Sequence, residues 1–223
     1  MNGKLIVIEG LDGSGKSTQF SLLYDYLNRA GQAFRKVKFP DYESDSSMAV
    51  RMYLNGDIGR NPAQINAYAA SSFYAVDRYI SFKNIWGEYY LAGGNVITDR
   101  YTTSNPIYQM TKLPKDNWHG YLNWLWDYEY EKLKLPQPDL VIYLDMDPEI
   151  SKKLLSKRYK GDESKRDIHE SNDSYLKSCR KAGLYTAEMC KWEKITCFND
   201  GEPLSVEEIH GRILGVVKQR LGM

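Results

Sequence analysis

The chain has 223 residues, a formal net charge of +1 and 42% hydrophobic residues. This length fits a single α/β domain, residues 1–223, and the near-neutral charge argues against nucleic acid or an anionic membrane as a partner. No 18-residue apolar run and no basic-then-apolar leader is present, so we expect a soluble, untargeted protein.

The cysteines and histidines show no spacing typical of metal ligands. The cysteines lack a CxxC pair, which favours reduced thiols in a cytoplasmic protein; they are Cys179, Cys190 and Cys197. The histidines are scattered, which argues against a zinc site; they are His119, His169 and His210.

A glycine-rich loop follows the first strand-like run, residues 4–8, and precedes a helical pattern over residues 15–30. Residues 10–17 read GLDGSGKS and match G-x-x-x-x-G-K-[ST]. In this pattern backbone N–H groups curl around a phosphate, Lys16 reaches the outer phosphates and the Ser17 hydroxyl binds Mg²⁺. The pattern predicts a triphosphate site formed by Gly10, Gly13, Ser14, Gly15, Lys16, Ser17 and Thr18.

The second strand-like run, residues 34–39, ends near Phe39, Pro40 and Tyr42. Ligands of α/β sheets bind at the carboxyl ends of strands, so we expect these side chains to face the same crevice as the loop. The polar segment 41–61 is interrupted by glycine, which predicts a short helix and a loop.

A long helical pattern covers residues 62–91. Tyr74 and Arg78 lie four residues apart and share one face of this helix. They could offer an aromatic plate for a base and a cation for a phosphate or carbonyl. The alternative is a tyrosine–arginine pair at the edge of the core.

Asp99 and Arg100 stand at the end of the third strand-like run, residues 95–99. An aspartate at a strand end beside a phosphate loop commonly holds Mg²⁺ or its waters, and an arginine there can grip a phosphate with two hydrogen bonds. An exposed salt bridge is the alternative. Hydroxyl and amide side chains over residues 101–109 suit a polar ring and a sugar, or form a simple polar connection.

The remaining elements continue the alternation of strands and helices. Strand-like runs cover residues 139–145 and 194–198, and helical patterns cover residues 117–134, 147–158, 171–191 and 205–221. In the last pattern Ser205 and Glu208 have the spacing of a capping box. The chain is therefore predicted to have an α/β P-loop NTPase fold with a five-stranded parallel sheet flanked by helices.

Residues 11–14 of the loop hold no basic side chain. Phosphoryl transfer usually needs a further cation on the transferred group, worth about 10³–10⁵ in rate in arginine-finger systems. The nearest supply is the polar stretch 157–170, which includes Arg158 and Arg166. We expect this stretch to be a mobile lid that delivers an arginine and excludes water; the alternative is a solvated charged surface.

Together these segments resemble the thymidylate kinase family of nucleoside monophosphate kinases. Residues 9–19 (EGLDGSGKSTQ) resemble its loop E-G-x-D-x-x-G-K-x-T-Q, and residues 99–109 (DRYTTSNPIYQ) resemble its segment D-R-Y-x-x-S-x-x-x-Y-Q. The Phe-Pro pair and the Tyr74–Arg78 spacing match its monophosphate site, and the polar stretch matches its lid. The resemblance covers nearly the whole chain.

The resemblance implies a role for each matched position. On the donor side it implies Lys16 and Ser17 for the phosphates and Mg²⁺, Asp99 near the metal, Arg158 or Arg166 as the catalytic lid arginine, and an adenine-side loop at 199–203 that includes Gly201. On the acceptor side it implies Asp12 on the 3′-hydroxyl of deoxyribose, Arg78 and Arg100 on the phosphate, Tyr74 stacked on the pyrimidine, and a pocket completed by Phe39, Pro40, Tyr42, Ser104, Tyr108 and Gln109.

Two positions depart from the family pattern. Tyr42 stands where the family has an arginine directed at the acceptor nucleotide, and Ile107 replaces a small residue before the Tyr-Gln pair. Both positions are on the acceptor side, so the departures concern the base and the acceptor phosphate rather than phosphoryl transfer.

The resemblance implies a cytoplasmic homodimer that uses ATP and Mg²⁺ to convert dTMP to dTDP in dTTP synthesis. Tyr42 leaves open a kinase for another deoxynucleotide or for a deoxynucleoside. A nucleotide-binding regulator without turnover is the alternative of another class. The aromatic residues that could cover either the core or a dimer interface are Trp118, Trp124, Trp126, Tyr128 and Tyr130.

Overall fold

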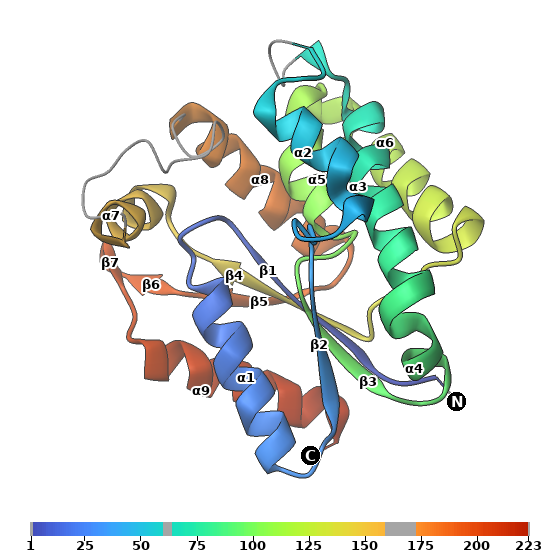
Figure 1. The fold of residues 1–223 in the computed structure, drawn as a ribbon. Helices are drawn as coiled ribbons and strands as arrows, with labels where there is room; N and C mark the ends of the chain where they lie inside the picture. The colour runs from blue at the N-terminus through green and yellow to red at the C-terminus, as the bar shows by residue number, and fades with distance from the viewer. Residues whose placement is uncertain (1, 60–63, 159–172, 223) are drawn as a thin grey trace.

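The computed structural model describes residues 2–59, 64–158 and 173–222. Its main sheet has five parallel strands in the order β2-β3-β1-β4-β5, which confirms the predicted sheet (Figure 1). The strands are β1 (Leu5–Gly10), β2 (Phe34–Lys38), β3 (Asn95–Asp99), β4 (Leu140–Asp145) and β5 (Glu193–Thr196). Because β1 is central, the loop that follows it emerges between the carboxyl ends of β3 and β4.

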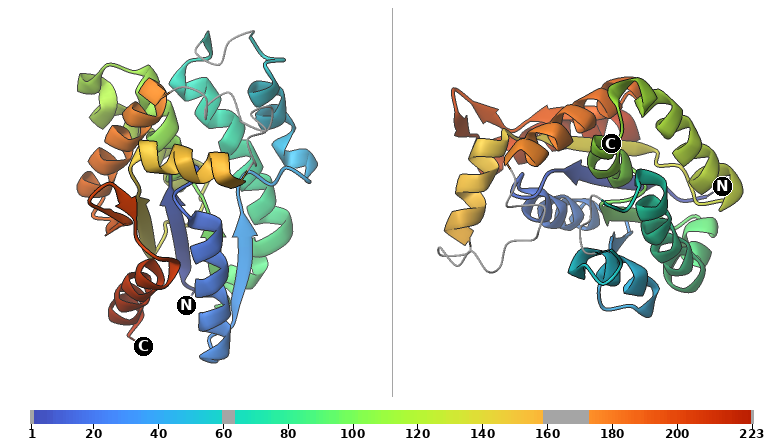
Figure 2. Two further views of the ribbon diagram at one scale, coloured as in Figure 1. Left: turned by 90° about the vertical axis from the view of Figure 1, so that its left-hand side faces the viewer. Right: turned by 90° about the horizontal axis from the view of Figure 1, so that it is seen from above.

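Helices cover both faces of this sheet (Figures 1 and 2). One face packs against α1 (Lys16–Arg29) and α9 (Val206–Leu221). On the other side of the sheet lie α3 (Ala67–Ser81), α4 (Gly87–Leu91), α5 (Ser104–Gln109) and α8 (Asp173–Met189), and α6 (Trp118–Trp126) packs against α3 and α8. The remaining two helices, α2 (Met48–Asn55) and α7 (Pro148–Arg158), lie at the carboxyl end of the sheet.

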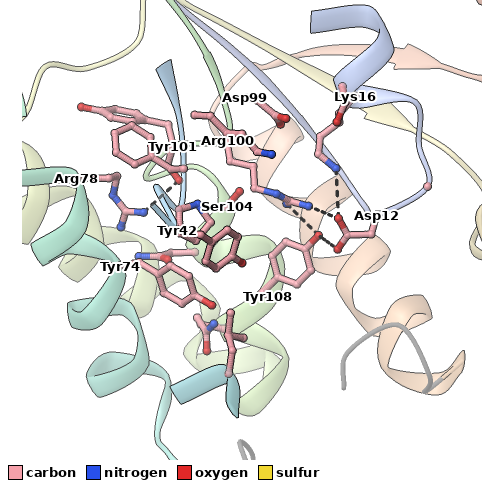
Figure 3. Close-up of a pocket in the computed structure, with 18 of the residues that line it drawn as sticks. Asp12, Lys16, Tyr42, Tyr74, Arg78, Asp99, Arg100, Tyr101, Ser104 and Tyr108 are labelled. Carbon is pink, nitrogen blue, oxygen red and sulfur yellow. Dashed lines mark hydrogen bonds and ion pairs between the residues drawn. The ribbon is translucent and has the colours of Figure 1, made fainter. Parts of the chain in front are cut away.

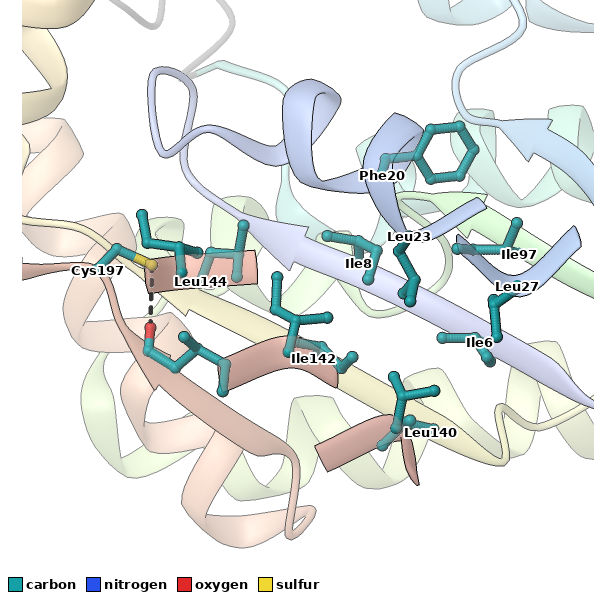
Figure 4. Packing of buried hydrophobic residues seen from close by; sticks show 14 of the residues in the cluster. Ile6, Ile8, Phe20, Leu23, Leu27, Ile97, Leu140, Ile142, Leu144 and Cys197 are labelled. Carbon is teal, nitrogen blue, oxygen red and sulfur yellow. Dashed lines mark hydrogen bonds between the residues drawn. The ribbon is translucent and has the colours of Figure 1, made fainter. Parts of the chain in front are cut away.

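Side chains alternate along β1 and pack into two separate hydrophobic cores, one on each face of the sheet. Ile6 and Ile8 pack against Leu23 and Leu27 of α1, and all four side chains are fully buried (Figure 4). The intervening residues, Leu5 and Val7, point to the opposite face and join the cluster around Trp86. A strand covered on both faces reads as a continuous apolar run, which is why residues 5–8 are all hydrophobic.

The helix expected over residues 62–91 begins later and is not uniform. Asn66 caps α3 by accepting a hydrogen bond from the Ala69 N–H at 2.9 Å, so the predicted start was wrong. A π-helical segment, Phe82–Trp86, joins α3 to α4 and places Trp86 in the core. A second π-helical segment, Asp127–Lys132, continues α6 in the region predicted as one helix.

The structure confirms some of the remaining predicted elements and corrects others. The capping box at Ser205 and Glu208 is present. The region predicted as a short helix and a loop, residues 41–61, contains α2 as expected and also a 3₁₀ turn that was not predicted. The sequence did not predict α5, whose proline at 106 is tolerated because it lies in the first turn. The strand expected over 194–198 ends at Thr196, and a hairpin of β6 (Phe198–Asn199) and β7 (Glu202–Pro203) follows.

Within the described residues, no helix is both long and apolar enough to cross a membrane. All three cysteines are unpaired, as the sequence predicts. Cys179 and Cys197 are buried, and burial raises the pKa of each thiol to about 12, which makes both unreactive at neutral pH. Cys190 is half-buried.

Candidate active site

The glycine-rich loop connects β1 to α1 and depends on glycine at two crowded positions. Gly10 and Gly13 have φ of 149° and 78°. A Cβ at Gly10 would lie 2.8 Å from the Leu144 carbonyl oxygen, and one at Gly13 would lie 2.7 Å from that of Ser151. The loop is thus pressed against β4 and α7, and its backbone is free to curl around an anion.

A cavity of about 360 Å³ opens above this loop at the carboxyl end of the sheet (Figure 3). From the loop it is lined by Asp12, Gly13, Gly15, Lys16, Ser17 and Thr18. The segment after β2 contributes Phe39, Pro40 and Tyr42, and α3 contributes Tyr74 and Arg78. From β3 and α5 it is lined by Asp99, Arg100, Ser104, Tyr108 and Gln109. Segments distant in sequence therefore meet at one site.

Some candidate residues lie away from this cavity. Gly10 and Ser14 belong to the loop but do not line the cavity. Gly201, with φ of 79°, lies in the turn of the β6–β7 hairpin. Arg158 is the last residue of α7, but its side chain is outside the described part of the structure. Arg166 and the rest of the expected lid over 159–170 lie outside the described residues as well.

Asp12 is surrounded by positive charge. Its Oδ1 accepts a hydrogen bond from Arg100 Nη2 at 2.5 Å and lies 3.7 Å from Lys16 Nζ, and its Oδ2 accepts one from the Tyr108 hydroxyl at 3.3 Å (Figure 3). Burial alone would raise the pKa of Asp12, but the charges of Arg100 and Lys16 lower it to about 2. Asp12 is therefore ionised at neutral pH and can accept a hydrogen bond from a hydroxyl.

Lys16 lies inside the loop with its side chain 6% exposed. Its ammonium donates a hydrogen bond to the Leu11 carbonyl at 2.8 Å. Burial and the nearby charge of Arg100 lower the pKa of Lys16, whereas Asp12, Asp99 and Glu9 oppose that shift. The lysine is held by the loop backbone at the floor of the cavity, where the donor phosphates are expected.

Asp99 and Ser17 provide oxygen atoms suited to Mg²⁺. Asp99 is 4% exposed, and its Oδ1 has no hydrogen-bond partner among the described residues. The Ser17 side chain is exposed at the start of α1 and lines the same cavity. Magnesium prefers carboxylate, hydroxyl and water oxygens and is commonly held by one or two protein groups plus phosphates, so these residues fit it.

Arg78 is fixed by a buried carboxylate that the sequence did not reveal. Glu129, in the second π-helical segment, accepts hydrogen bonds from Arg78 Nε at 2.7 Å and Nη2 at 2.5 Å. It also accepts from Thr102 Oγ1 and Asn105 Nδ2. The third guanidinium nitrogen, Nη1, donates a longer hydrogen bond of 3.4 Å to the Tyr101 carbonyl, so it is the group that Arg78 can most readily offer a ligand.

A second buried carboxylate, Glu9, joins the end of β1 to the segment after β3. It accepts hydrogen bonds from the Tyr101 N–H at 3.2 Å, the Thr103 hydroxyl at 2.6 Å and the Ser104 hydroxyl at 2.9 Å. Burial raises the pKa of Glu9, which the charge of Arg100 partly offsets. Ser104 lines the cavity as expected, but its hydroxyl proton is directed to Glu9 rather than to the cavity.

The wall farthest from the loop is aromatic with a buried amide. Tyr74 meets Tyr53 edge-on, with ring centroids 6.3 Å apart. Gln109 is buried, and its Oε1 has no hydrogen-bond partner in the described chain. Tyr42, at 47% exposed, borders the opening. A planar ring with a hydrogen-bonding edge fits such a wall.

The chain is similar to known thymidylate kinases over nearly its whole length. The family model described as thymidylate kinase matches residues 8–213. A thymidylate kinase of Schizosaccharomyces pombe is 30% identical over 96% of this chain and 91% of its own length. That of Sulfurihydrogenibium is 32% identical over 98% of both chains. Among solved structures, thymidylate kinase from Candida albicans has a TM-score of 0.72 and 22% identity, covering 99% of this chain and 93% of that one, which supports the fold.

These matches include the loop, the end of β3 and the cavity that joins them, as the resemblance of residues 9–19 and 99–109 predicts. The chain therefore belongs to the thymidylate kinase family, whose members are phosphotransferases.

Proposed function

We propose that the chain transfers the γ-phosphoryl group of ATP to dTMP and releases dTDP and ADP. The observation that carries this proposal is a shared cavity in which a phosphate-binding loop faces an aromatic wall with a buried amide. The donor triphosphate needs the loop, and the acceptor base needs the wall. Arg100 lies between them, beside Asp12 and Lys16 (Figure 3).

On the donor side, we assign the phosphates to Lys16 and to the backbone of the loop. Mg²⁺, when bound, neutralises charge on the donor phosphates, and Ser17 and Asp99 are the residues that would hold it or its waters. The β6–β7 hairpin with Gly201 is assigned to the adenine side. A lid arginine, Arg158 or Arg166, would add the cation that residues 11–14 lack.

On the acceptor side, we assign the phosphate to Arg100 with help from Arg78, the 3′-hydroxyl to Asp12 and the base to Tyr74 and Gln109. The unpartnered Gln109 Oε1 supports a hydrogen bond to the base. The protein needs no general base, because a phosphate monoester is already a competent nucleophile near neutral pH. Its main contribution is to align the two phosphates and stabilise the charge of the transition state.

The test is a comparison of initial rates with dTMP, dUMP, dCMP and thymidine, with ATP and Mg²⁺ present. We expect the highest kcat/KM for dTMP, and we expect Lys16→Ala to lower kcat about 100-fold or more. A preference for thymidine would favour the deoxynucleoside kinase, which Tyr42 keeps as the second candidate. ATP binding without transfer to any monophosphate would favour the regulator.

We also propose a cytoplasmic homodimer. The aromatic residues named above pack largely on one another, with Trp124 stacked on Tyr128 and Trp126 on Tyr130. Exposed aliphatic side chains lie instead on α3, where Val76 is 45% exposed. Sedimentation at micromolar concentration tests the dimer, and a monomeric mass would contradict it. The unpaired cysteines support a reducing compartment.

A further inference from the structure

We propose that Lys38, the last residue of β2, binds the phosphate groups at the junction of donor and acceptor. It would supply a cation that neither residues 11–14 of the phosphate loop nor position 42 provides. This inference rests on the proposed function, because it assigns a role in the same phosphoryl transfer.

The strand register directs Lys38 toward the phosphate side of the cavity. Lys36, two residues earlier, has its ammonium 3.9 Å from the ring centroid of Tyr24 in α1. Side chains two residues apart on a strand share a face, so Lys38 also points to the α1 side. It pairs in register with Asp99 on β3 and lines the cavity together with Lys16 and Ser17.

The other cations of the cavity are already engaged. Arg78 is paired with Glu129, Arg100 with Asp12, and Lys16 donates to the Leu11 carbonyl. Lys38 is exposed, and no described residue forms a hydrogen bond, ion pair or ring contact with its ammonium. A flexible lysine with a hydrated ammonium can therefore turn toward a phosphate without breaking an existing contact.

Two places near the phosphates where a further basic residue would make Lys38 redundant hold none. Residues 11–14 hold no arginine or lysine, and Tyr42 occupies the position at which the family resemblance implies an arginine. A lysine on an edge strand can also serve only to prevent strand pairing between molecules, and β2 is an edge strand. That explanation applies equally to Lys36, which stacks on Tyr24 away from the cavity, so Lys36 is a matched control.

The experiment compares Lys38→Met, Lys38→Arg and Lys36→Met by steady-state kinetics with dTMP and ATP and by calorimetric titration with dTMP. We expect Lys38→Met to lower kcat/KM for dTMP about 10- to 100-fold, since it removes a charge-assisted hydrogen bond. Lys38→Arg should keep most of the activity. Lys36→Met should stay within about twofold of wild type, because its ammonium contacts a ring and not a phosphate.

Equal activity of Lys38→Met and Lys36→Met would overturn the inference and leave Lys38 as an edge-strand lysine. Should Lys38→Met fail to fold, Lys38→Gln provides the same comparison, because it keeps a polar side chain without the charge. A wild-type protein that is inactive with every monophosphate would instead refute the proposed function, so the two failures are distinguishable.

Discussion

Arg78 and Glu129 form a two-pronged ion pair from which water is excluded, with side chains 2% and 0% exposed. Removing one member of such a pair leaves an uncompensated buried charge, which typically costs about 3–5 kcal/mol. The pair also sets the orientation of the guanidinium, because Nε and Nη2 both point at the carboxylate. Glu129 thereby decides which edge of Arg78 faces the cavity.

We expect Glu129→Gln to raise the KM for dTMP about tenfold and to change kcat less, because the amide cannot hold both nitrogens of Arg78 as an acceptor. Steady-state kinetics with varied dTMP and saturating ATP measure this. Glu131→Gln is the matched control, since Glu131 is exposed in the same π-helical segment and pairs only weakly with Lys134 at 3.6 Å. A lower melting temperature with an unchanged KM would show that Glu129 is structural only.

Asp12→Ala should reduce the discrimination between acceptors that have and acceptors that lack the 3′-hydroxyl. Its carboxylate is ionised and directed into the cavity, where we assign it to the 3′-hydroxyl, so its loss alters the contact with the sugar. The ratio of kcat/KM for dTMP to that for 3′-deoxythymidine monophosphate measures this discrimination with the base and the phosphate held constant. We expect it to fall about tenfold. An unchanged ratio would remove the assigned role of Asp12.

Arg158→Ala and Arg166→Ala test the origin of the catalytic cation. Removal of the arginine that stabilises the transferred group should lower kcat about 10³-fold and should raise the KM for dTMP far less. Lys160→Ala provides a control from the same charged stretch. If neither arginine lowers kcat more than Lys160→Ala does, the stretch is a solvated surface.

The environment of Lys112 predicts that the free energy of unfolding depends on pH. It is half-buried, donates hydrogen bonds to the Tyr53 hydroxyl and the Ile65 carbonyl, and burial lowers its pKa from 10.5 to about 8. Between pH 8 and 10.5 the unfolded chain therefore binds more protons at this lysine than the folded protein does, so the lysine's contribution to stability rises with pH in that window.

The measurement is urea unfolding of wild type and Lys112→Met at pH 7 and pH 10. Subtracting the free energy of unfolding of the variant from that of wild type at each pH cancels the effect of the tyrosines that titrate in both proteins. We expect the free energy of unfolding of wild type to gain up to about 3 kcal/mol relative to Lys112→Met over this range. A constant difference would show that the lysine titrates near its ordinary pKa.

Most of the fold could be predicted from local sequence signals. Apolar strands such as residues 5–8, the glycine loop and the capping box at Ser205 are encoded within a few residues, and the structure confirms them. The two π-helical segments and α5 could not be predicted, because their geometry depends on packing across the sheet rather than on helical periodicity.

The residues of the site could likewise be predicted only where local sequence motifs mark them. Most of the lining residues were found because motifs place them near strand ends, and the cavity brings them together. Glu129 was missed because its partner Arg78 lies 51 residues away in sequence and no motif joins them. Lys38 was missed because a lysine at the end of a strand carries no distinctive pattern until the register with Asp99 is known.

The carboxylate of Glu9 has a consequence for how the two substrates meet. It ties the end of β1, which carries the phosphate loop, to Tyr101, Thr103 and Ser104, which lead into the acceptor wall. Both halves of the cavity are therefore parts of one rigid frame built on adjacent strands. The sheet therefore fixes how the attacking phosphate and the leaving group are aligned. Residues at the rim of the cavity, such as Tyr42, can change the acceptor preference without altering this alignment.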